Sequence, residues 1–375
     1  MNHSSFIDLS IVATLLYPKP FNIVTTTDGF IGKNWLMRMI GCIPTKKFVS
    51  DLSLIHDMNY ALTTLRSSVV LFPEAGYSFD GTATVLPESL GKCIKLLKAP
   101  VVMIKTEGAF LRDPLYNNLQ VRRVKVSATE KFLLSKEELE ALSCEEINEI
   151  VKREFSFDGF REQAESQTRI TEPTRADYLN RILYKCPECL AEGSMLGKGT
   201  EITCKKCGKT HIMTELGTLE AKDGKTSFSH IPDWFAWERE CVRREIEEGK
   251  YSMDIPVDIC MTVDTKNIYR VGEGRLTHTK DEGFRLTGCD GKLDYQQKPL
   301  ASYTLNSDFN WYEIGDVIGI GNHEALYYCF PKTSGDIVAK ARLATEEIYK
   351  IAREEHKPKH PCGAENCKHP TCEEK

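Results

Sequence analysis

The chain has 375 residues, of which 41% are hydrophobic, so it is long enough to form two or three domains, each with a core. Lysine and arginine total 49 against 54 aspartate and glutamate residues, and the formal net charge of −5 removes any general electrostatic reason to expect nucleic acid or an anionic membrane as a partner. The longest apolar stretches, such as residues 9–17, fall short of the roughly 20 residues that a membrane-spanning helix needs, so we expect neither such a helix nor a signal peptide.

Residues 1–165 alternate between helix patterns and strand patterns. Apolar helices are predicted around Leu9 and Trp35, and buried strands over residues 68–74 and 100–108, each followed by turn-forming residues. This alternation predicts an α/β domain in which helices cover a parallel or mixed sheet.

Two charged helices are predicted next, each opened by an S-x-x-E capping box: Ser135 with Glu138, and Ser143 with Glu146. In such a box the serine hydroxyl and the glutamate carboxylate each accept a hydrogen bond from the other residue's backbone N–H. Around residues 165–174 the periodicity lapses, and an interdomain linker or an ordinary surface loop fits that stretch equally well.

Two C-x-x-C pairs separated by fourteen residues have the spacing of a zinc ribbon, which we place at residues 180–215. The four expected ligands are Cys186, Cys189, Cys204 and Cys207. Four thiolates close the coordination shell, so the zinc would be structural. His211 lies nearby in sequence and is expected at the surface, outside the ligand set. Metal-bound thiolates and the absence of an export signal favour the reducing cytoplasm.

Residues 228–353 predict an α+β domain rich in strands. A helix is expected at 233–250 and a last helix at 334–355. Between them, short strands separated by glycine, aspartate and asparagine are expected at 258–264, 274–280, 283–288, 300–306, 311–321 and 325–330. Several strands closed by one C-terminal helix resemble the pleckstrin-homology-like or GRAM-like architecture.

The C-terminal tail, residues 354–375, is rich in cysteine and histidine. Its candidate ligands are His360, Cys362, Cys367, His369 and Cys372. The segment is short, polar and terminal, so both metal binding and disorder remain open as interpretations.

The opening "NHSSFID" places His3 and Asp8 five residues apart. On a regular helix this spacing separates two side chains, so they converge only if His3 lies in a loop and Asp8 in the first turns of a helix. A carboxylate can then hold the imidazole in one tautomer, which is the arrangement that takes a proton from a hydroxyl.

The second candidate segment is "LFPEAGYSFDGT", in which a strand ends at Phe72-Pro73-Glu74 and runs into Gly76 and Ser78. A turn of this kind exposes backbone N–H groups that suit a phosphate or another polar head group. The alternative is a plain exit from a strand, with Glu74 as a helix cap.

These segments resemble the lysophosphatidate (1-acylglycerol-3-phosphate) acyltransferase family. "NHSSFID" is similar to the family's first motif, N-H-x-x-x-x-D, and "FPEAGYS" to its third, F-P-E-G-T-R-S. Between them "GKNWLMRMIGCIPTKK" resembles the second motif around Gly41 and Pro44, and "APVVMI" resembles the apolar fourth. The four motifs stand in the family's order within about the first 105 residues.

The resemblance implies transfer of a fatty acyl group from a coenzyme A or acyl carrier protein thioester to a glycerol hydroxyl of a lysophospholipid. His3 would be the general base and Asp8 would orient it, with no acyl-enzyme. Residues implied in substrate binding are Lys46, Lys47, Phe72, Pro73, Glu74, Gly76 and Ser78, of which Glu74 and Gly76 would hold the acceptor head group. Such an enzyme would work in phospholipid biosynthesis as a peripheral protein on the cytoplasmic face of the membrane.

Two departures from the family pattern matter. Tyr77 stands where the third motif has arginine, and Ala75 replaces its first glycine, so another cation must grip a phosphate or the acceptor is not a phosphate monoester. Candidate cations are Lys46, Lys47, Lys105, Arg122 and Arg123. Only Met1 and Asn2 precede His3, so we expect a domain truncated at its N-terminus, with a poorly anchored base and weak or no activity. The alternative is that the downstream packing of Phe6, Leu9 and Ile11 suffices to hold the loop.

Two further interpretations stay open. The first is a lipid-binding or scaffold protein with an acyltransferase fold and little or no activity, which Tyr77 favours. The second is a zinc-ribbon protein that binds nucleic acid, which rests only on the slight basic excess of residues 181–209.

Overall fold

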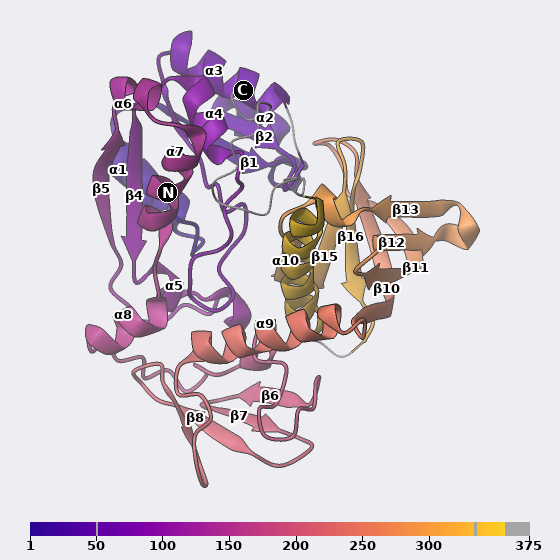
Figure 1. Cartoon of the computed structure of the whole chain (residues 1–375). Coiled ribbons are helices and arrows are strands. Elements are labelled where there is room, and N and C mark those ends of the chain that lie inside the picture. Colours follow the sequence, from indigo (N-terminus) through magenta and orange to yellow (C-terminus); the bar gives the residue numbers. More distant parts are fainter. Residues whose placement is uncertain (50–51, 334–335, 357–375) are drawn as a thin grey trace, which may run out of the picture.

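The computed structural model describes residues 1–49, 52–333 and 336–356. It contains an N-terminal α/β unit (residues 1–165), a cysteine module (residues 184–221) and a sheet domain (residues 231–356), arranged around the long helix α9 (Ile231–Glu247), as Figure 1 shows. The expected ligands of the tail lie outside the described residues. No helix in the described ranges is both long enough and apolar enough to cross a membrane.

The N-terminal unit contains two separate sheets. Strands β1 (Phe21–Thr26), β2 (Cys42–Thr45) and β3 (Ser68–Val70) pair in parallel in the order β2-β1-β3, and β4 (Val101–Glu107) pairs antiparallel with β5 (Ser127–Leu134). The helices are α1 (Asp8–Leu16), α2 (Asn34–Met39), α3 (Leu52–Thr63), α4 (Leu90–Leu97), α5 (Ala109–Arg112), α6 (Lys136–Ala141), α7 (Cys144–Phe155) and α8 (Gly159–Glu165). The mixture of helices and parallel and antiparallel strands agrees with the expected α/β class.

The parallel sheet of the N-terminal unit is covered on both faces. Alternate side chains of a strand point to opposite faces. Ile23 of β1 packs in one apolar cluster with Val12 of α1 and Met37 of α2. Its neighbour Val24 packs in another cluster with Met58 of α3. Helices α1 and α2 therefore share one face of the sheet, and α3 lies on the other.

Both predicted capping boxes are present. The hydroxyls of Ser135 and Ser143 accept from the N–H groups of Glu138 and Glu146, and the two carboxylates accept in return. The stretch at 165–174 is not a free linker, because Ile170 is only 1% exposed and its N–H donates to the carbonyl of Glu215 at 2.8 Å.

The cysteine module is a small antiparallel sheet whose four strands pair in sequence order. They are β6 (Met195–Lys198), β7 (Glu201–Cys204), β8 (Thr210–Met213) and β9 (Leu219–Ala221). Helix α9 anchors the module, since the indole N–H of Trp234 donates to the carbonyl of Lys185 at 3.0 Å and Glu238 accepts the N–H of Lys185 at 2.7 Å.

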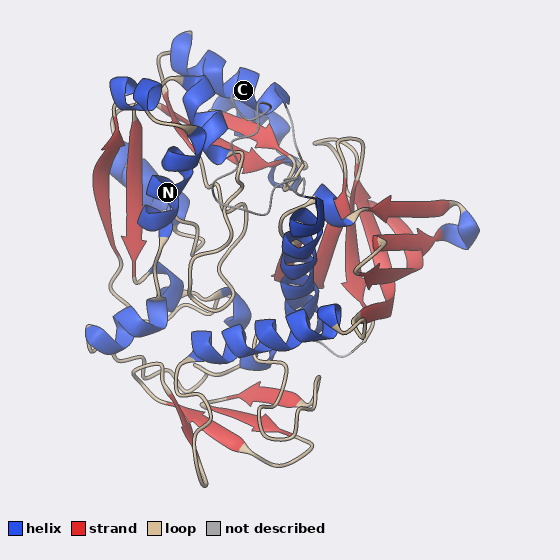
Figure 2. Cartoon of the chain, in the orientation of Figure 1, coloured by secondary structure: helices blue, strands red, loops and turns tan. Residues whose placement is uncertain are grey.

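The sheet domain holds seven antiparallel strands in the order β13-β12-β11-β10-β16-β15-β14 and ends in helix α10 (Ile337–His356), drawn in Figure 2. The strands are β10 (Ser252–Thr262), β11 (Tyr269–Thr279), β12 (Gly283–Gly288), β13 (Leu293–Gln297), β14 (Asn306–Trp311), β15 (Gly315–Gly321) and β16 (Leu326–Pro331). This agrees with an antiparallel α+β domain, while the likeness to a pleckstrin-homology fold stays a prediction.

Two details of the sheet domain differ from the sequence prediction. The strand expected at 300–306 is a short 3₁₀ turn (Pro299–Ala301) followed by loop, because a proline opens that turn and lacks the N–H of a strand ladder. Strands β13 and β14 were not predicted. Strand β14 lies between two expected strands. Strand β13, with the pattern "LDYQQ", pairs with β12 largely through exposed polar residues, which carry little periodic signal.

One continuous apolar core joins the three parts. Phe79 and Phe110 of the N-terminal unit, Ile202 of the cysteine module, and Trp234 and Leu343 of the two long helices all belong to it. Helix α10 lies between the seven-stranded sheet and the N-terminal unit (Figure 1). The turn that contains Tyr77 and Phe79 is therefore in contact with the sheet domain.

Candidate active site

The structure brings His3 and Asp8 together. Nδ1 of His3 lies 2.9 Å from Oδ2 of Asp8. His3 lies in the loop before α1 and Asp8 in its first turn, as the spacing predicts. Asp8 is 1% exposed, and the same Oδ2 accepts the backbone N–H groups of Ser4 at 2.9 Å and Ser5 at 3.2 Å. With Nδ1–H donating to this fixed carboxylate, Nε2 of His3 is the nitrogen left to accept a proton.

The loop that carries His3 is well anchored, contrary to our expectation. Asn2 is 1% exposed, and its Oδ1 accepts the backbone N–H of Thr106 in β4 at 2.9 Å. The N-terminal amine of Met1 donates to the carbonyl of Leu71 at 3.2 Å. The first residues are thus held between β4 and the segment after β3, so backbone contacts far along the sequence fix the imidazole.

Glu74 connects the two motif segments. Its Oε2 accepts the backbone N–H of His3 at 2.7 Å, and its Oε1 accepts the N–H and the hydroxyl of Thr84 at 3.1 and 3.0 Å. Burial raises the pKa of Glu74, and the hydrogen bonds from His3 and Thr84 oppose that rise. Glu74 is 1% exposed, so in this structure its carboxylate holds the histidine loop. A role in head-group binding stays a prediction.

Aromatic rings surround His3. The ring centroids of Phe72 and Tyr77 lie 4.5 and 4.2 Å from that of the imidazole, and Phe6 stacks on Tyr77 at 5.8 Å. Burial, with smaller contributions from Asp8 and Asp308, raises the pKa of the Tyr77 phenol. Tyr77 is thus a neutral ring against the imidazole in the position where the resemblance leads one to expect a cation.

The rest of the "FPEAGYS" segment forms tight turns. The N–H of Ala75 donates to the carbonyl of Phe72 at 3.0 Å, which turns the chain at Pro73. A Cβ at Gly76 would meet nothing within 4 Å, so this side of the turn is open. The hydroxyl of Ser78 is occupied within the turn, since it donates to the carbonyl of Thr82 at 2.6 Å and accepts the N–H of Gly81 at 2.9 Å.

The structure shows partners for the five candidate cations outside the "FPEAGYS" turn, and for Arg123 only the backbone partner. Lys46 donates to the carbonyl of His323, and Lys47 lies close enough to Asp308 to oppose the rise that burial causes in the pKa of that carboxyl. Lys105 donates to the carbonyl of Ser156 at 2.9 Å. Arg122 is 3% exposed and donates to the hydroxyl of Tyr116 at 2.9 Å, while the backbone N–H of Arg123 donates to Glu172 at 2.8 Å.

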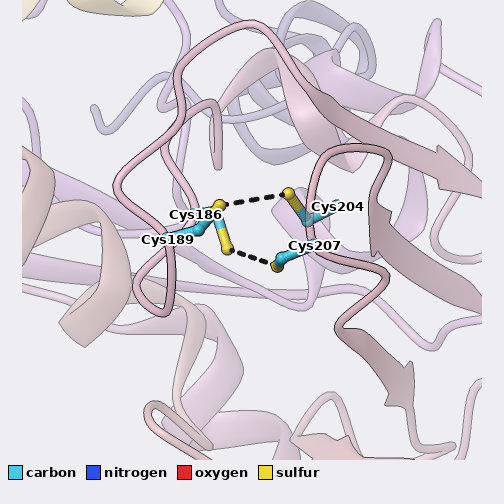
Figure 3. Close-up of side chains that lie close together, drawn as sticks. All are labelled: Cys186, Cys189, Cys204 and Cys207. Carbon is cyan, nitrogen blue, oxygen red and sulfur yellow. Dashed lines mark hydrogen bonds between the residues drawn. The ribbon is translucent and has the colours of Figure 1, made fainter.

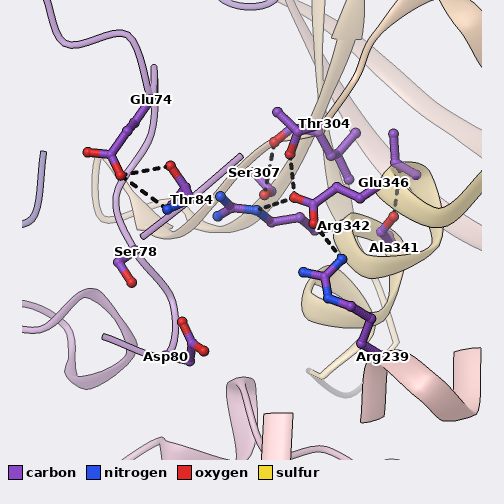
Figure 4. A network of polar contacts seen from close by, with 12 residues as sticks. Glu74, Ser78, Asp80, Thr84, Arg239, Thr304, Ser307, Ala341, Arg342 and Glu346 are labelled. Carbon is purple, nitrogen blue, oxygen red and sulfur yellow. Dashed lines mark hydrogen bonds and ion pairs between the residues drawn. The ribbon is translucent and has the colours of Figure 1, made fainter. Parts of the chain in front are cut away.

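Arg342 of α10 is the residue that sequence reasoning missed. Its Nη1 donates to the carbonyl of Tyr77 at 3.3 Å, and its guanidinium lies over the ring of Phe79 at 4.4 Å. Glu346, one turn along the helix, contacts both Arg342 and Arg239 of α9 (Figure 4). The separation of 265 residues between Arg342 and Tyr77 leaves no local pattern by which the pair could be found.

The four predicted cysteine ligands converge on one point (Figure 3). All four Sγ atoms lie within 4.8 Å of one another, and the pairs Cys186–Cys207 and Cys189–Cys204 are 3.7 Å apart. Four thiolates at Zn–S distances of about 2.3 Å stand about 3.8 Å apart in a tetrahedron, so the donor set fits zinc.

His211 is not at the surface, contrary to our expectation. It is fully buried, and its ring meets the indole of Trp234 edge-to-face at 5.3 Å. Burial lowers its pKa. Its position on β8, inside the core, keeps it outside the cysteine cluster, so the ligand set of the described residues is the four thiolates.

In comparisons with known proteins, no family model, no curated protein and no solved structure matched this chain.

Proposed function

We propose that this chain is an acyltransferase that moves a fatty acyl group from a coenzyme A or acyl carrier protein thioester to a hydroxyl of a lysophospholipid-type acceptor in phospholipid biosynthesis. The acceptor we favour is 1-acylglycerol-3-phosphate. The observation that carries the proposal is the contact of 2.9 Å between His3 and the buried Asp8, held beside the "FPEAGYS" segment through Glu74.

In the proposed reaction, Nε2 of His3 removes the proton from the acceptor hydroxyl as its oxygen attacks the thioester carbonyl. A C–O bond forms, the C–S bond breaks, and the leaving thiolate takes the proton from the imidazolium. Asp8 holds the imidazole in the required tautomer and stabilises the imidazolium. The aromatic rings of Phe72 and Tyr77 would further stabilise the imidazolium of His3 by cation–π interactions.

The acceptor head group would bind on the open side of the turn at Gly76. Because Tyr77 cannot bind a phosphate bidentately as an arginine does, we propose that Lys47 supplies the positive charge. The nearby carboxyl of Asp308 would partly offset that charge when it is ionised. We further propose that the protein acts as a peripheral enzyme at the cytoplasmic face of the membrane, and that zinc bound by the four cysteines is structural.

A second candidate function is lipid binding or scaffolding without turnover. The observation that favours it is the close packing of the sheet domain on the third-motif turn, with the rings of Phe79 and Phe309 4.5 Å apart. A domain placed there can limit access to His3.

The test is thiol release from long-chain acyl-coenzyme A with a panel of acceptors: lysophosphatidate, other lysolipids and glycolipids. We expect thiol release and a matching ester product with at least one acceptor, and a loss of about 10²-fold or more in Asp8→Asn, which keeps the shape of the carboxylate. Ester formation that is equal in Asp8→Asn would contradict the mechanism. Tight lipid binding with no product from any acceptor would favour the second candidate.

A further inference from the structure

Helices α1 and α2 present an exposed apolar surface. On α1, Leu9 and Leu15 are 47% and 39% exposed, and on α2, Trp35 and Met39 are 70% and 68% exposed. Tyr17 and Ile40, which directly follow the two helices, are 83% and 52% exposed. We call these six residues the α1–α2 surface. Large apolar side chains in water cost free energy, so their concentration on two short helices points to a contact.

The two helices pack on the same apolar cluster. Val12 of α1 and Met37 of α2 pack inward on the same cluster as Ile23, whereas α3 packs on the cluster that contains Val24. Helices α1 and α2 therefore both cover the face of the parallel sheet that lies opposite α3.

The segment that carries this surface is positively charged, although the whole chain carries −5. Residues 9–49 contain five lysine and arginine residues and a single acidic residue, Asp28. Lys46 and Lys47 of this set are directed to the sheet domain. Lys19, Lys33 and Arg38 are exposed beside the apolar side chains.

The α1–α2 surface adjoins the proposed catalytic pair. Helix α1 begins at Asp8, which contacts His3. Phe6, in the loop just before the helix, is 64% exposed and stacks on Tyr77, whose ring contacts His3. A partner on this surface would thus lie next to the imidazole.

We propose that the α1–α2 surface binds a bilayer that contains anionic phospholipid. Tryptophan and tyrosine favour the membrane–water interface, leucine and methionine insert among acyl chains, and lysine and arginine pair with lipid phosphates. A second copy of the chain fits less well, because an isologous contact would set this basic surface against itself. This proposal deepens the proposed function, because an acceptor lipid in the bound bilayer would lie near His3. Its relevance to catalysis rests on the proposed function.

The test is flotation of the full chain with vesicles of phosphatidylcholine alone and of phosphatidylcholine mixed with phosphatidylglycerol. We expect binding to the mixed vesicles that weakens as salt is added. The variant Trp35→Glu/Met39→Glu should bind more weakly by about tenfold or more, and Lys33→Glu/Arg38→Glu by about tenfold, on the mixed vesicles only. Both variants change exposed residues, and unchanged circular dichroism will show that they fold.

A matched control is Leu190→Glu/Tyr269→Glu, which adds the same charges at residues 61% and 42% exposed in the cysteine module and in β11, and which should bind like the wild type. Tryptophan fluorescence should shift to the blue on binding, because Trp35 is 70% exposed, whereas Trp234 and Trp311 are buried and Trp237 is partly buried. The proposal is overturned if the wild type binds neither vesicle, if the Trp35 variant binds equally, or if that variant only dissociates a dimer.

This assay reads binding without turnover, so it stays informative if acyl transfer fails. If transfer is found, the Trp35→Glu/Met39→Glu variant should keep the wild-type rate on a soluble short-chain acceptor and lose rate on vesicles. An equal loss on both acceptors would contradict the docking role while leaving the proposed chemistry in place.

Discussion

Arg342 donates a hydrogen bond to the backbone carbonyl of Tyr77 at 3.3 Å, and this contact joins the last helix to the turn beside His3. The guanidinium also lies over Phe79, whose ring packs on Phe309 of β14. The ring of Tyr77 lies 4.2 Å from that of His3. The sheet domain thus supports a residue in direct contact with the proposed base, as a positioning element.

Arg342→Ala should lower kcat for acyl transfer by about tenfold with little change in KM, because Tyr77 would lose its fixed position against His3. It should also destabilise the fold by about 2 kcal/mol, since a buried charge-assisted contact is lost. Steady-state kinetics and denaturant unfolding measure the two effects. The matched control is Lys350→Ala, whose ion pair with Glu347 stays within α10. Equal kcat in Arg342→Ala and the control would refute the positioning role.

Tyr77→Phe should retain most of the activity, and Tyr77→Ala should lose about tenfold or more in kcat. The reason is that the ring face, 4.2 Å from the imidazole, supports the imidazolium, whereas the hydroxyl is not required. Rates measured across pH check this, because Tyr77→Ala should also shift the pH profile. A large loss in Tyr77→Phe would instead assign a role to the phenol hydroxyl.

The local part of the site could be predicted from the sequence. The His3–Asp8 contact, both capping boxes and the cysteine cluster depend on residues at short, fixed spacings, and each forms as expected. Local spacing suffices there because one turn or one helix start brings the side chains together.

The long-range part could not be predicted. The anchoring of Asn2 on Thr106 spans 104 residues, and that of Tyr77 on Arg342 spans 265, so neither leaves a pattern in any window of the sequence. His211 was misplaced for a related reason. A lone polar residue on a short strand gives no sign that the indole of Trp234, on another element, will cover it.

Removal of metal should unfold the cysteine module and weaken its contact with α9. We expect one zinc per chain by elemental analysis, and a strong chelator should lower the midpoint of thermal unfolding by about 10 °C. Cys204→Ser should lower the midpoint of thermal unfolding by a similar amount without chelator. Cys144→Ser, at the start of α7 and outside the cluster, is the control and should retain zinc. Full stability of a zinc-free chain would exclude a structural metal.

Asp308 should make the fold less stable as pH rises. Burial raises its pKa from 3.8 to about 6, so between these values the native state binds more protons than the unfolded state, and the free energy of unfolding falls with rising pH. The difference in the free energy of unfolding between Asp308→Asn and the wild type should therefore be more favourable to the variant at about pH 7 than at about pH 5. Denaturant unfolding at both pH values measures this.

The control for this pH effect is Asp294→Asn. The hydrogen bond from Arg285 lowers the pKa of the exposed Asp294 below its ordinary value of 3.8, so this carboxylate is ionised in both states at about pH 5 and about pH 7, and its replacement should give the same difference from the wild type at both pH values. The interpretation fails if Asp308→Asn shows the same difference from the wild type at both pH values.

The measurement that tests the central claim most directly is ester formation by the wild type and by His3→Ala with the same thioester and acceptor. The control is His56→Ala, at an exposed position on α3. A general base contributes about 10²- to 10⁴-fold, so we expect that loss in His3→Ala, none in His56→Ala, and unchanged thermal unfolding in both. Equal rates in His3→Ala and the wild type would contradict the claim that the His3–Asp8 pair carries out the chemistry.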